Sequence, residues 1–104
     1  AAAGALVERS RAQGVVVGDG GNRLRLEFVS EVQDIVRGDV VVTSGIDGIF
    51  PKGFVIGRVD TVEKSGGAYR RIGVTPAVDF SSLEEVLVVL TRTGARGAAG
   101  ERSQ

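Results

Sequence analysis

The 104-residue sequence contains no histidine, cysteine, methionine or tryptophan, and it has only one tyrosine. Without histidine or cysteine the chain cannot form a Ser-His-Asp or Cys-His nucleophile system, because the base that activates the hydroxyl or the thiol is missing. Zinc sites of the usual Cys/His type are excluded for the same reason. We therefore expect a protein that is not an enzyme, with no catalytic residues, no metal and no cofactor.

The chain also has no net charge and no long apolar run. Thirteen basic residues balance thirteen acidic ones and are interspersed with them, so no basic stripe is available to neutralise a nucleic-acid backbone. The longest apolar runs, such as residues 86–90, are far shorter than the ~20 residues of a membrane-spanning helix. No secretory signal is visible. The chain is therefore expected to be either cytoplasmic or a fragment of a larger protein, with no nucleic-acid partner.

The first half of the sequence has the pattern of a β-hairpin. Residues 23–28 alternate charged and apolar side chains, which places Leu24, Leu26 and Phe28 on a buried face. The preceding residues 13–18 read as a valine-rich strand. The glycines and the asparagine between the two segments suit a turn that requires positive φ.

The longest expected strand covers residues 54–64, where the apolar pattern changes phase. Val55, Gly57 and Val59 share one face, and the next valine, Val62, follows after three residues instead of two. One extra residue near positions 60 and 61 would absorb this shift as a β-bulge.

The second half of the sequence contains further strand patterns. Residues 70–76 alternate again, with Ile72 and Val74 facing inward and Pro76 at the strand end, because proline cannot donate to a ladder. Three more segments are expected: a strand over residues 5–9, a short helical turn at 83–85 and a final strand over 86–90.

Six or seven short strands separated by turn residues, with almost no helix, predict an all-β protein. The sixteen glycines favour a small antiparallel β-barrel, because tight corners and bulges recur around such a barrel. We expect residues 1–12 to form an N-terminal segment that adds one strand and residues 13–91 to form the barrel. Residues 92–104 have no large apolar side chain and are expected to be a disordered tail.

The connection over residues 44–54 is the most informative stretch of the sequence. A flexible linker would be polar throughout, whereas this one mixes apolar and turn residues, so we expect a folded loop. Its apolar residues either plug the end of the barrel or form a surface for a protein partner. These residues are Ile46, Ile49, Phe50 and Phe54. The residues expected to build structural turns are Gly38, Asp39, Gly45, Pro51, Gly53 and Gly57.

The polar residues allow several chemical interpretations, each with a simpler structural alternative. Ser44 could act as a nucleophile with Lys52 as its base, but serine in loops commonly bonds the local backbone. The aspartates lack the spacing of a calcium loop or a carboxylate dyad, and they fit turn chemistry. The glycines of residues 18–21 do not open a helix, which a phosphate-binding loop requires.

A series of spaced motifs runs through residues 9–90. The motifs are Gly14 with Gly18, Gly38-Asp39, Thr43-Ser44-Gly45, Phe50-Pro51-x-Gly53, Gly57-x-Val59, Pro76-Ala77-x-Asp79 and the apolar run from Leu83 to Val89. As an ordered set they resemble the C-terminal extracytoplasmic part of MreC, a family of bacterial rod-shape-determining proteins.

The resemblance implies a membrane-anchored scaffold whose outer portion consists of two small β-barrels after a transmembrane helix and a coiled coil. This chain would hold mainly the second barrel. Proteins of this family organise the lateral peptidoglycan-elongation machinery, contact its penicillin-binding transpeptidase and other rod-complex proteins, and self-associate. The implied location is extracytoplasmic, in the periplasm or on the outer face of the cytoplasmic membrane, with the anchor outside these residues.

Two other classes of function remain open. One is an unrelated small β-barrel that binds a small ligand or a saccharide, although carbohydrate sites usually offer aromatic platforms and this chain has few aromatic residues. The other is a remnant hydrolase. A hydrophobic span followed by heptads upstream of residue 1 would distinguish the scaffold from both.

Overall fold

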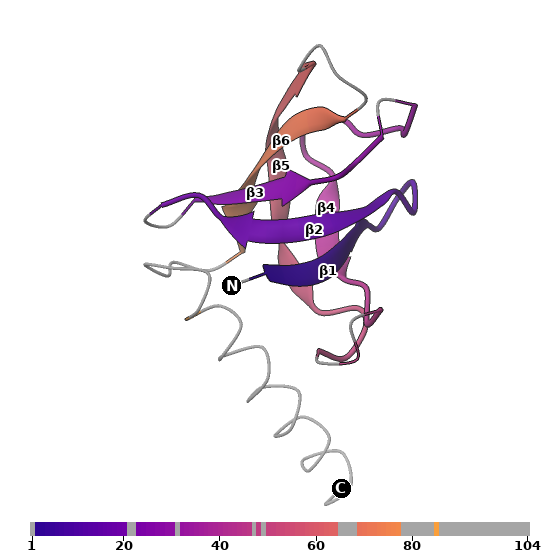
Figure 1. Ribbon diagram of the computed structural model, residues 1–104, viewed down its shortest axis with the longest axis vertical. Helices are drawn as coiled ribbons and strands as arrows, with labels where there is room; N and C mark the ends of the chain where they lie inside the picture. The colour runs from indigo at the N-terminus through magenta and orange to yellow at the C-terminus, as the bar shows by residue number, and fades with distance from the viewer. Residues whose placement is uncertain are drawn as a thin grey trace, which may run out of the picture.

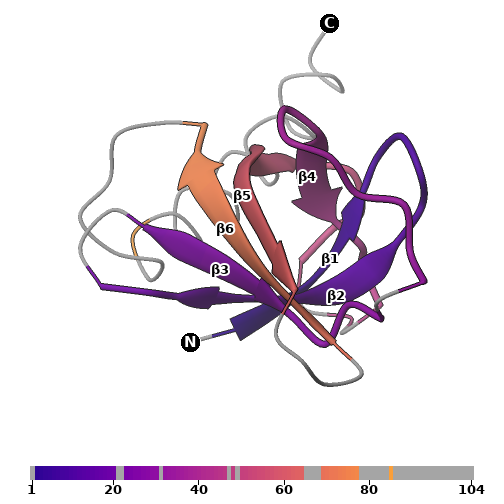
Figure 2. The ribbon, with the colours of Figure 1, turned by 90° about the horizontal axis from the view of Figure 1, so that it is seen from above.

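The computed structural model describes residues 2–20, 23–30, 32–46, 48, 50–64, 69–77 and 85. These residues form a closed antiparallel barrel with the strand order β1-β2-β3-β6-β5-β4, seen from the side in Figure 1 and from above in Figure 2. The six strands are β1 (Ala2–Val7), β2 (Gln13–Gly18), β3 (Leu24–Glu27), β4 (Val40–Thr43), β5 (Val55–Lys64) and β6 (Arg70–Pro76). The predicted all-β barrel is confirmed.

The hairpin of β2 and β3 forms where the alternating pattern predicts it. Val16 lies opposite Leu26 in the register, and both side chains are buried. The turn between the strands is held by hydrogen bonds from the Arg23 amide to the Gly20 carbonyl oxygen at 3.1 Å and from the Asp19 amide to the Arg23 carbonyl oxygen at 2.9 Å. Gly20 has a φ of +85°, a conformation that glycine adopts without steric cost.

The core fills the barrel interior with small and branched side chains. Ile72 and Val74 of β6 are fully buried, as the alternation predicts. Gly14 packs so closely that an added Cβ would lie 2.8 Å from a methyl group of Val29. The buried cluster consists of Ala3, Ala5, Val7, Ala12, Val16, Leu24, Leu26, Val29, Ile35, Val41, Ile56, Val59, Ile72 and Val74.

Strand β5 contains the predicted irregularity and a second one. Its register with β6 shifts between Val59 and Thr61, which confirms the predicted bulge near this point. Its register with β4 also shifts, because Val41 lies opposite Gly57 while Val42 lies opposite Val55. The extra residue is Ile56, which is 1% exposed.

This second shift corrects the predicted orientation of Val55. The alternation placed Val55 on the buried face with Val59, but Val55 is 49% exposed. Because Ile56 occupies the inward position at the shift, the residue before it is turned to the outer surface.

The prediction for Phe28 is wrong for a related reason. Phe28 follows β3 with a φ of +63°, outside the extended region that the alternation assumes. The chain therefore leaves the pleat at this residue, and the Phe28 side chain is 62% exposed. Val29 is fully buried and contributes to the core instead.

Strand β1 begins earlier than the predicted strand over residues 5–9, because it covers Ala2–Val7. It pairs with β2 on one side and with β4 on the other, and so closes the barrel. Apart from Glu85, the helical turn at 83–85, the strand over 86–90 and the tail over 92–104 lie outside the described residues. The described part of the chain contains no helix of the length and apolar character needed to cross a membrane.

Candidate functional site

The loop between β4 and β5 is closed at its base by Thr43. The Thr43 hydroxyl donates to the carbonyl oxygen of Pro51 at 2.6 Å and accepts from the amide of Phe54 at 2.9 Å. The Thr43 amide donates to the Phe54 carbonyl oxygen at 2.8 Å, and the Gly53 amide donates to the Thr43 carbonyl oxygen at 2.7 Å. Thr43 is 1% exposed. These buried bonds fix the two ends of the loop relative to each other.

The first turn of the loop is built by Ser44 and Gly45. The Ser44 hydroxyl accepts from the amide of Ile46 at 3.3 Å, and the Gly48 amide donates to the Gly45 carbonyl oxygen at 3.2 Å. Gly45 has a φ of +73°, and a Cβ there would lie 2.8 Å from the Cβ of Lys52. Only glycine satisfies both requirements. The hydroxyl of Ser44 thus serves the turn, as the structural alternative to catalysis proposed.

The apolar residues of the loop differ in their surroundings. Phe50 is half-buried and packs against the core cluster, and Phe54 is half-buried as well. Ile46 is 73% exposed. Ile49 lies outside the described residues. Phe50 therefore packs on the barrel, whereas Ile46 lies in solvent.

The expected turn before β4 is built around Asp39. Its carboxylate accepts from the amide of Val36 at 2.9 Å, and Gly38 has a φ of +92°. Pro51 and Gly53 are exposed in the β4–β5 loop, where Gly53 has a φ of +95°.

Gly57, which we expected in a turn, lies inside β5 and is buried. A Cβ at Gly57 would clash with the carbonyl oxygen of Thr75. The glycine is therefore required by the close approach of β5 and β6 and not by a turn.

Asp39 also forms an ion pair that the sequence did not reveal. Arg9 donates to its two carboxylate oxygens, from Nε at 2.8 Å and from Nη2 at 2.9 Å, and to Asp34 from Nη1 at 2.7 Å. Hydrogen bonding to Arg9 lowers the pKa of both carboxyl groups below their usual value. Arg9 and Asp39 are 30 residues apart, so no local pattern connects them.

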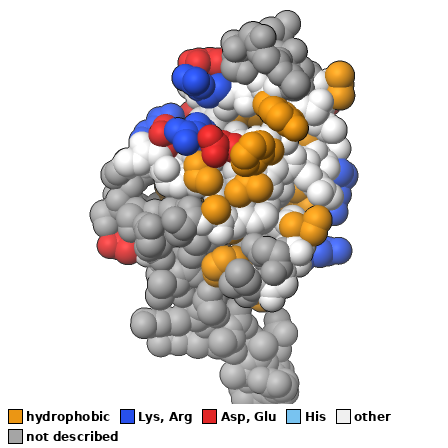
Figure 3. Space-filling view, viewed as in Figure 1, with side chains coloured by type: hydrophobic (Ala, Val, Ile, Leu, Met, Phe, Trp, Pro, Cys, Tyr) orange, Lys and Arg blue, Asp and Glu red, His pale blue; other side chains and the backbone are white. Residues whose placement is uncertain are grey.

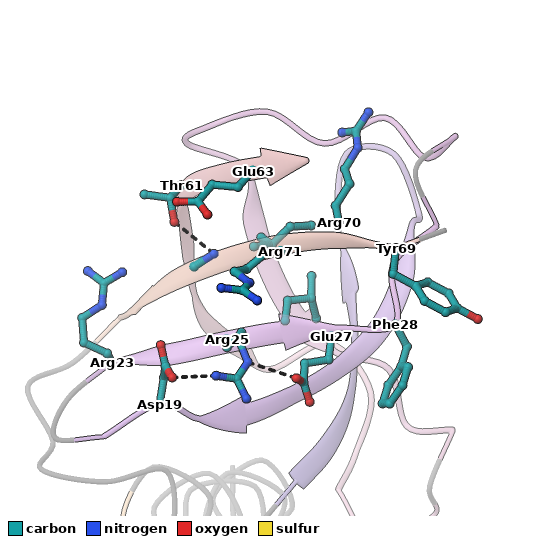
Figure 4. A pocket seen from close by; sticks show the side chains of 13 residues that line it. Asp19, Arg23, Arg25, Glu27, Phe28, Thr61, Glu63, Tyr69, Arg70 and Arg71 are labelled. Atoms are coloured by element: carbon teal, nitrogen blue, oxygen red, sulfur yellow. Dashed lines mark hydrogen bonds and ion pairs between the residues drawn. The ribbon is translucent and has the colours of Figure 1, made fainter. Parts of the chain in front are cut away.

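A charged groove of about 690 Å³ lies on the outer face of β3, β5 and β6. Arg25 occupies its centre and donates to Asp19 at 2.7 Å and to Glu27 at 3.0 Å, as Figure 4 shows. The rings of Phe28 and Tyr69 lie at one end of it. The alternation of residues 23–28 places the charges of β3 opposite its buried face, and the exposed position of Phe28 had no local signal.

The carboxylates of the described residues are not arranged as a metal site. Asp39 is bonded to Arg9 and Asp60 to Arg23. Within the described ranges, no group of three or more acidic, histidine or cysteine side chains lies close enough to hold a metal ion.

The barrel and its loops match a known family. The model of the rod shape-determining protein MreC, barrel core, matches residues 1–90. The chain belongs to the MreC family. The family identification confirms the resemblance carried by the spaced motifs.

Curated MreC proteins share about a third of their residues with this chain. The cell shape-determining protein MreC of Bacillus subtilis is 33% identical over 85 residues, which cover 77% of this chain and 29% of the relative. The MreC of Caulobacter vibrioides is 31% identical over 99 residues, covering 95% and 27%. That of Cereibacter sphaeroides is 37% identical over 84 residues, covering 80% and 26%. The chain thus spans less than a third of the length of these curated relatives.

Solved MreC structures contain the same barrel. One, named MreC, superposes with a TM-score of 0.72 at 28% identity and covers 78% of this chain and 48% of its own. The crystal structure of MreC from Pseudomonas aeruginosa gives a TM-score of 0.65 at 29% identity, covering 78% and 55%. A complex between the penicillin-binding protein PBP2 and MreC from Helicobacter pylori gives 0.64 at 29% identity, covering 74% and 48%.

Proposed function

We propose that this barrel is a non-catalytic scaffold domain of a membrane-anchored bacterial cell-shape protein. In this role it helps to organise the lateral peptidoglycan-elongation machinery from the extracytoplasmic side of the membrane. Its partners are an elongation-specific penicillin-binding transpeptidase, other proteins of the rod complex and further copies of the scaffold. The observation that carries the proposal is membership of the shape-determining MreC family, together with a related MreC solved in complex with PBP2.

The chemistry of the chain supports a role without catalysis. The sequence has no histidine or cysteine, and the hydroxyl of Ser44 is used in a backbone turn. General base catalysis needs a base within hydrogen-bond reach of the group that it activates. The purified chain should therefore cleave neither peptidoglycan nor peptides. Cleavage that Ser44→Ala abolishes would contradict this part of the proposal.

The loop over residues 44–54 is the proposed contact surface. Ile46 exposes most of its side chain to solvent, while the hydrogen bonds of Thr43 fix the two ends of the loop relative to each other. Anchoring of both loop ends lowers the conformational entropy that the loop loses when a partner covers it. Exposed apolar residues on ordered loops are typical of recognition surfaces.

The proposal is tested by binding of the chain to the purified extracytoplasmic region of an elongation-specific penicillin-binding transpeptidase. Ile46→Asp should weaken binding by about tenfold, or about 1.4 kcal/mol, and leave the melting temperature unchanged. Val55→Asp introduces the same charge at a half-exposed position outside the loop and serves as the control. Equal loss of binding in both variants would exclude the loop as the contact surface, and absence of binding by the unmodified chain would contradict this partner.

Ile49→Asp separates the two roles that the sequence leaves open for the loop. If Ile49 is part of the contact surface, the change should weaken association without affecting folding. If Ile49 plugs the barrel, the change buries an unpaired carboxylate and destabilises the fold by several kcal/mol. Thermal unfolding and the binding assay on the same variant distinguish these outcomes.

A further inference from the structure

A second exposed apolar surface lies at the other end of β5, where β3 ends and β6 begins. Phe28 and Tyr69 form an edge-to-face ring pair with centroids 5.9 Å apart and an interplanar angle of 87°. The two residues are 62% and 50% exposed. Tyr69 forms a β-bridge with Ser30, and Val32, two residues further on, is 88% exposed. We call Phe28, Tyr69 and Val32 the aromatic edge.

The exposed position of Phe28 has a conformational cost and no visible benefit to the core. A bulky residue with a positive φ is strained, because its Cβ approaches the backbone. Val29 supplies the buried side chain at this point of the barrel. A strained, exposed aromatic residue that the core does not need indicates a functional requirement at that position.

Two arginines of β6, Arg70 and Arg71, follow Tyr69 directly in the chain. Among the described residues, neither Arg70 nor Arg71 takes part in an ion pair. In the described structure the Arg70 side chain makes one long hydrogen bond, from Nη1 to the Ile35 carbonyl oxygen at 3.5 Å, and its Nε is buried without a hydrogen-bond partner. In Figure 4 the Arg70 side chain extends above β6, whereas the Arg71 guanidinium lies over the groove on the side of Arg25.

The described carboxylates around the edge form no ion pair with these arginines, although, besides the hydrogen bond from Arg9, the charge of Arg70 helps to lower the pKa of Asp34. Glu27 is bonded to Arg25, and Asp34 is bonded to Arg9. Glu63 lies opposite Arg71 in the register of β5 and β6, yet the two side chains form no ion pair. Figure 3 shows hydrophobic side chains directly beside charged ones on this face of the molecule. The edge thus combines exposed aromatic side chains with arginines that form no ion pair among the described residues.

We propose that the aromatic edge is a docking site for a protein segment that carries a large apolar side chain flanked by carboxylates. The apolar side chain packs against the rings of Phe28 and Tyr69, and the carboxylates pair with Arg70 and Arg71. Aromatic residues and arginine are the residue types that dominate binding energy at protein interfaces. The aromatic edge and the loop over residues 44–54 lie at opposite ends of β5, so the proposal does not depend on the function proposed for that loop.

The test measures binding of synthetic peptides to the full 104-residue chain by fluorescence anisotropy at low salt. One peptide carries Leu-Phe flanked by two glutamates on each side, and the matched peptide carries lysines in place of the glutamates. The acidic peptide should bind at least tenfold more tightly than the lysine peptide, and added salt should weaken its binding. Chitotetraose serves as a third ligand, because a glycan is the alternative occupant of an aromatic surface.

Phe28→Gly and Arg71→Glu separate binding from folding. Glycine removes the ring and relieves the positive φ, so Phe28→Gly should melt at the same or a higher temperature and bind the acidic peptide at least tenfold more weakly. Arg71→Glu should have a similar effect on binding, whereas Arg71→Lys retains most of the affinity. Val55→Asn changes a half-exposed apolar residue elsewhere on β5 and should leave binding intact.

Three results would overturn the proposal. They are equal affinity for the acidic and the lysine peptide, unchanged affinity in Phe28→Gly, and binding of chitotetraose in preference to the acidic peptide. Because the readout is peptide binding alone, failure of this proposal is distinct from failure of the transpeptidase assay.

Discussion

Aromatic residues lie in opposite environments at the two ends of β5. Before the strand, Phe50 packs against the core from a loop that Thr43 closes. Where β6 begins, Tyr69 packs on Phe28 and both rings are exposed. Figure 1 shows the loop before β5 at the lower end of the barrel and the start of β6 at the upper end.

The difference shows that backbone geometry, and not hydrophobicity, decides where these rings lie. The hydrogen bonds of Thr43 draw the β4–β5 loop back onto the barrel, so Phe50 meets the core. The left-handed conformation of Phe28 directs its ring away from the barrel, and Val29 takes the inward position. Transfer of a phenylalanine ring from water is favourable by about 1.5–3 kcal/mol, so the exposed ring forgoes a gain that the half-buried one partly obtains.

The largest loss of stability is expected from a substitution inside the barrel, and losses at its two ends can be compared with it. Leu26→Ala removes fully buried methyl groups from β3 and should destabilise the fold by about 2–5 kcal/mol in urea titrations. Arg25→Ala, at the neighbouring outward position, should cost far less. Equal losses would show that the inner and outer faces of β3 are assigned wrongly.

The β4–β5 loop, which Thr43 closes at its base, should lose stability when the Thr43 hydroxyl is removed. Thr43→Val keeps the shape of the side chain but leaves the Pro51 carbonyl oxygen and the Phe54 amide without this partner, at an expected cost of about 1–3 kcal/mol. Ser44→Ala removes a hydroxyl that bonds only the Ile46 amide in the described structure and should cost less. Urea titration together with hydrogen exchange at Phe54 measures both effects, and unchanged exchange in Thr43→Val would contradict the role of Thr43.

Acid should weaken the turn that precedes β4. Arg9 lowers the pKa of Asp39 below its unfolded value, so the stabilising contribution is present above the unfolded pKa of about 3.9 and is lost as the pH falls through the lower folded pKa. Asp39→Asn should lower the free energy of unfolding at pH 7 and flatten its pH dependence between pH 5 and 2. The expected loss is only about 1 kcal/mol, because Arg9 is half exposed and the ion pair is partly screened by solvent. Melting temperatures across this pH range test whether stability falls as the pH is lowered. Asp34→Asn, which changes a more exposed partner of Arg9, should flatten the profile less.

The smallest loss of stability is expected at the exposed Ile46 of the β4–β5 loop. Ile46→Ser should change the free energy of unfolding by less than about 0.5 kcal/mol, because the side chain is largely in water. Phe50→Ala removes a ring that packs on the core and should cost clearly more. If both variants lose the same stability in urea, Ile46 packs on the barrel as Phe50 does, which would contradict the difference between the two residues.

The sequence predicted those parts of the fold that local pattern controls. Strands β2 and β6 have the expected bounds, because alternation and flanking turn residues are properties of neighbouring positions. The bulge after Val59 was visible as a change of phase. The shift at Ile56 and the left-handed Phe28 were not, because alternation assumes a regular backbone.

The candidate sites were predictable to different degrees. The β4–β5 loop was recognised because its apolar and turn residues are contiguous. The ion pair of Arg9 with Asp39 and the ring pair of Phe28 with Tyr69 join positions far apart in the chain. Contacts of this kind depend on which strands the closed barrel makes neighbours, and a single sequence does not encode that in any local pattern.

Closure of the barrel also limits the kinds of contact through which another protein could bind its strands. The described strands form a complete ring, so none of them has a whole edge free to which another chain could add a strand through backbone hydrogen bonds. We therefore expect recognition of these strands to depend mainly on side chains. Backbone pairing tolerates most sequences, whereas side-chain recognition depends on residue identity. The residues of two contacting surfaces should therefore change together in evolution. A barrel exchanged between distant species should then fold normally and yet fail to bind the proposed partners in its new host.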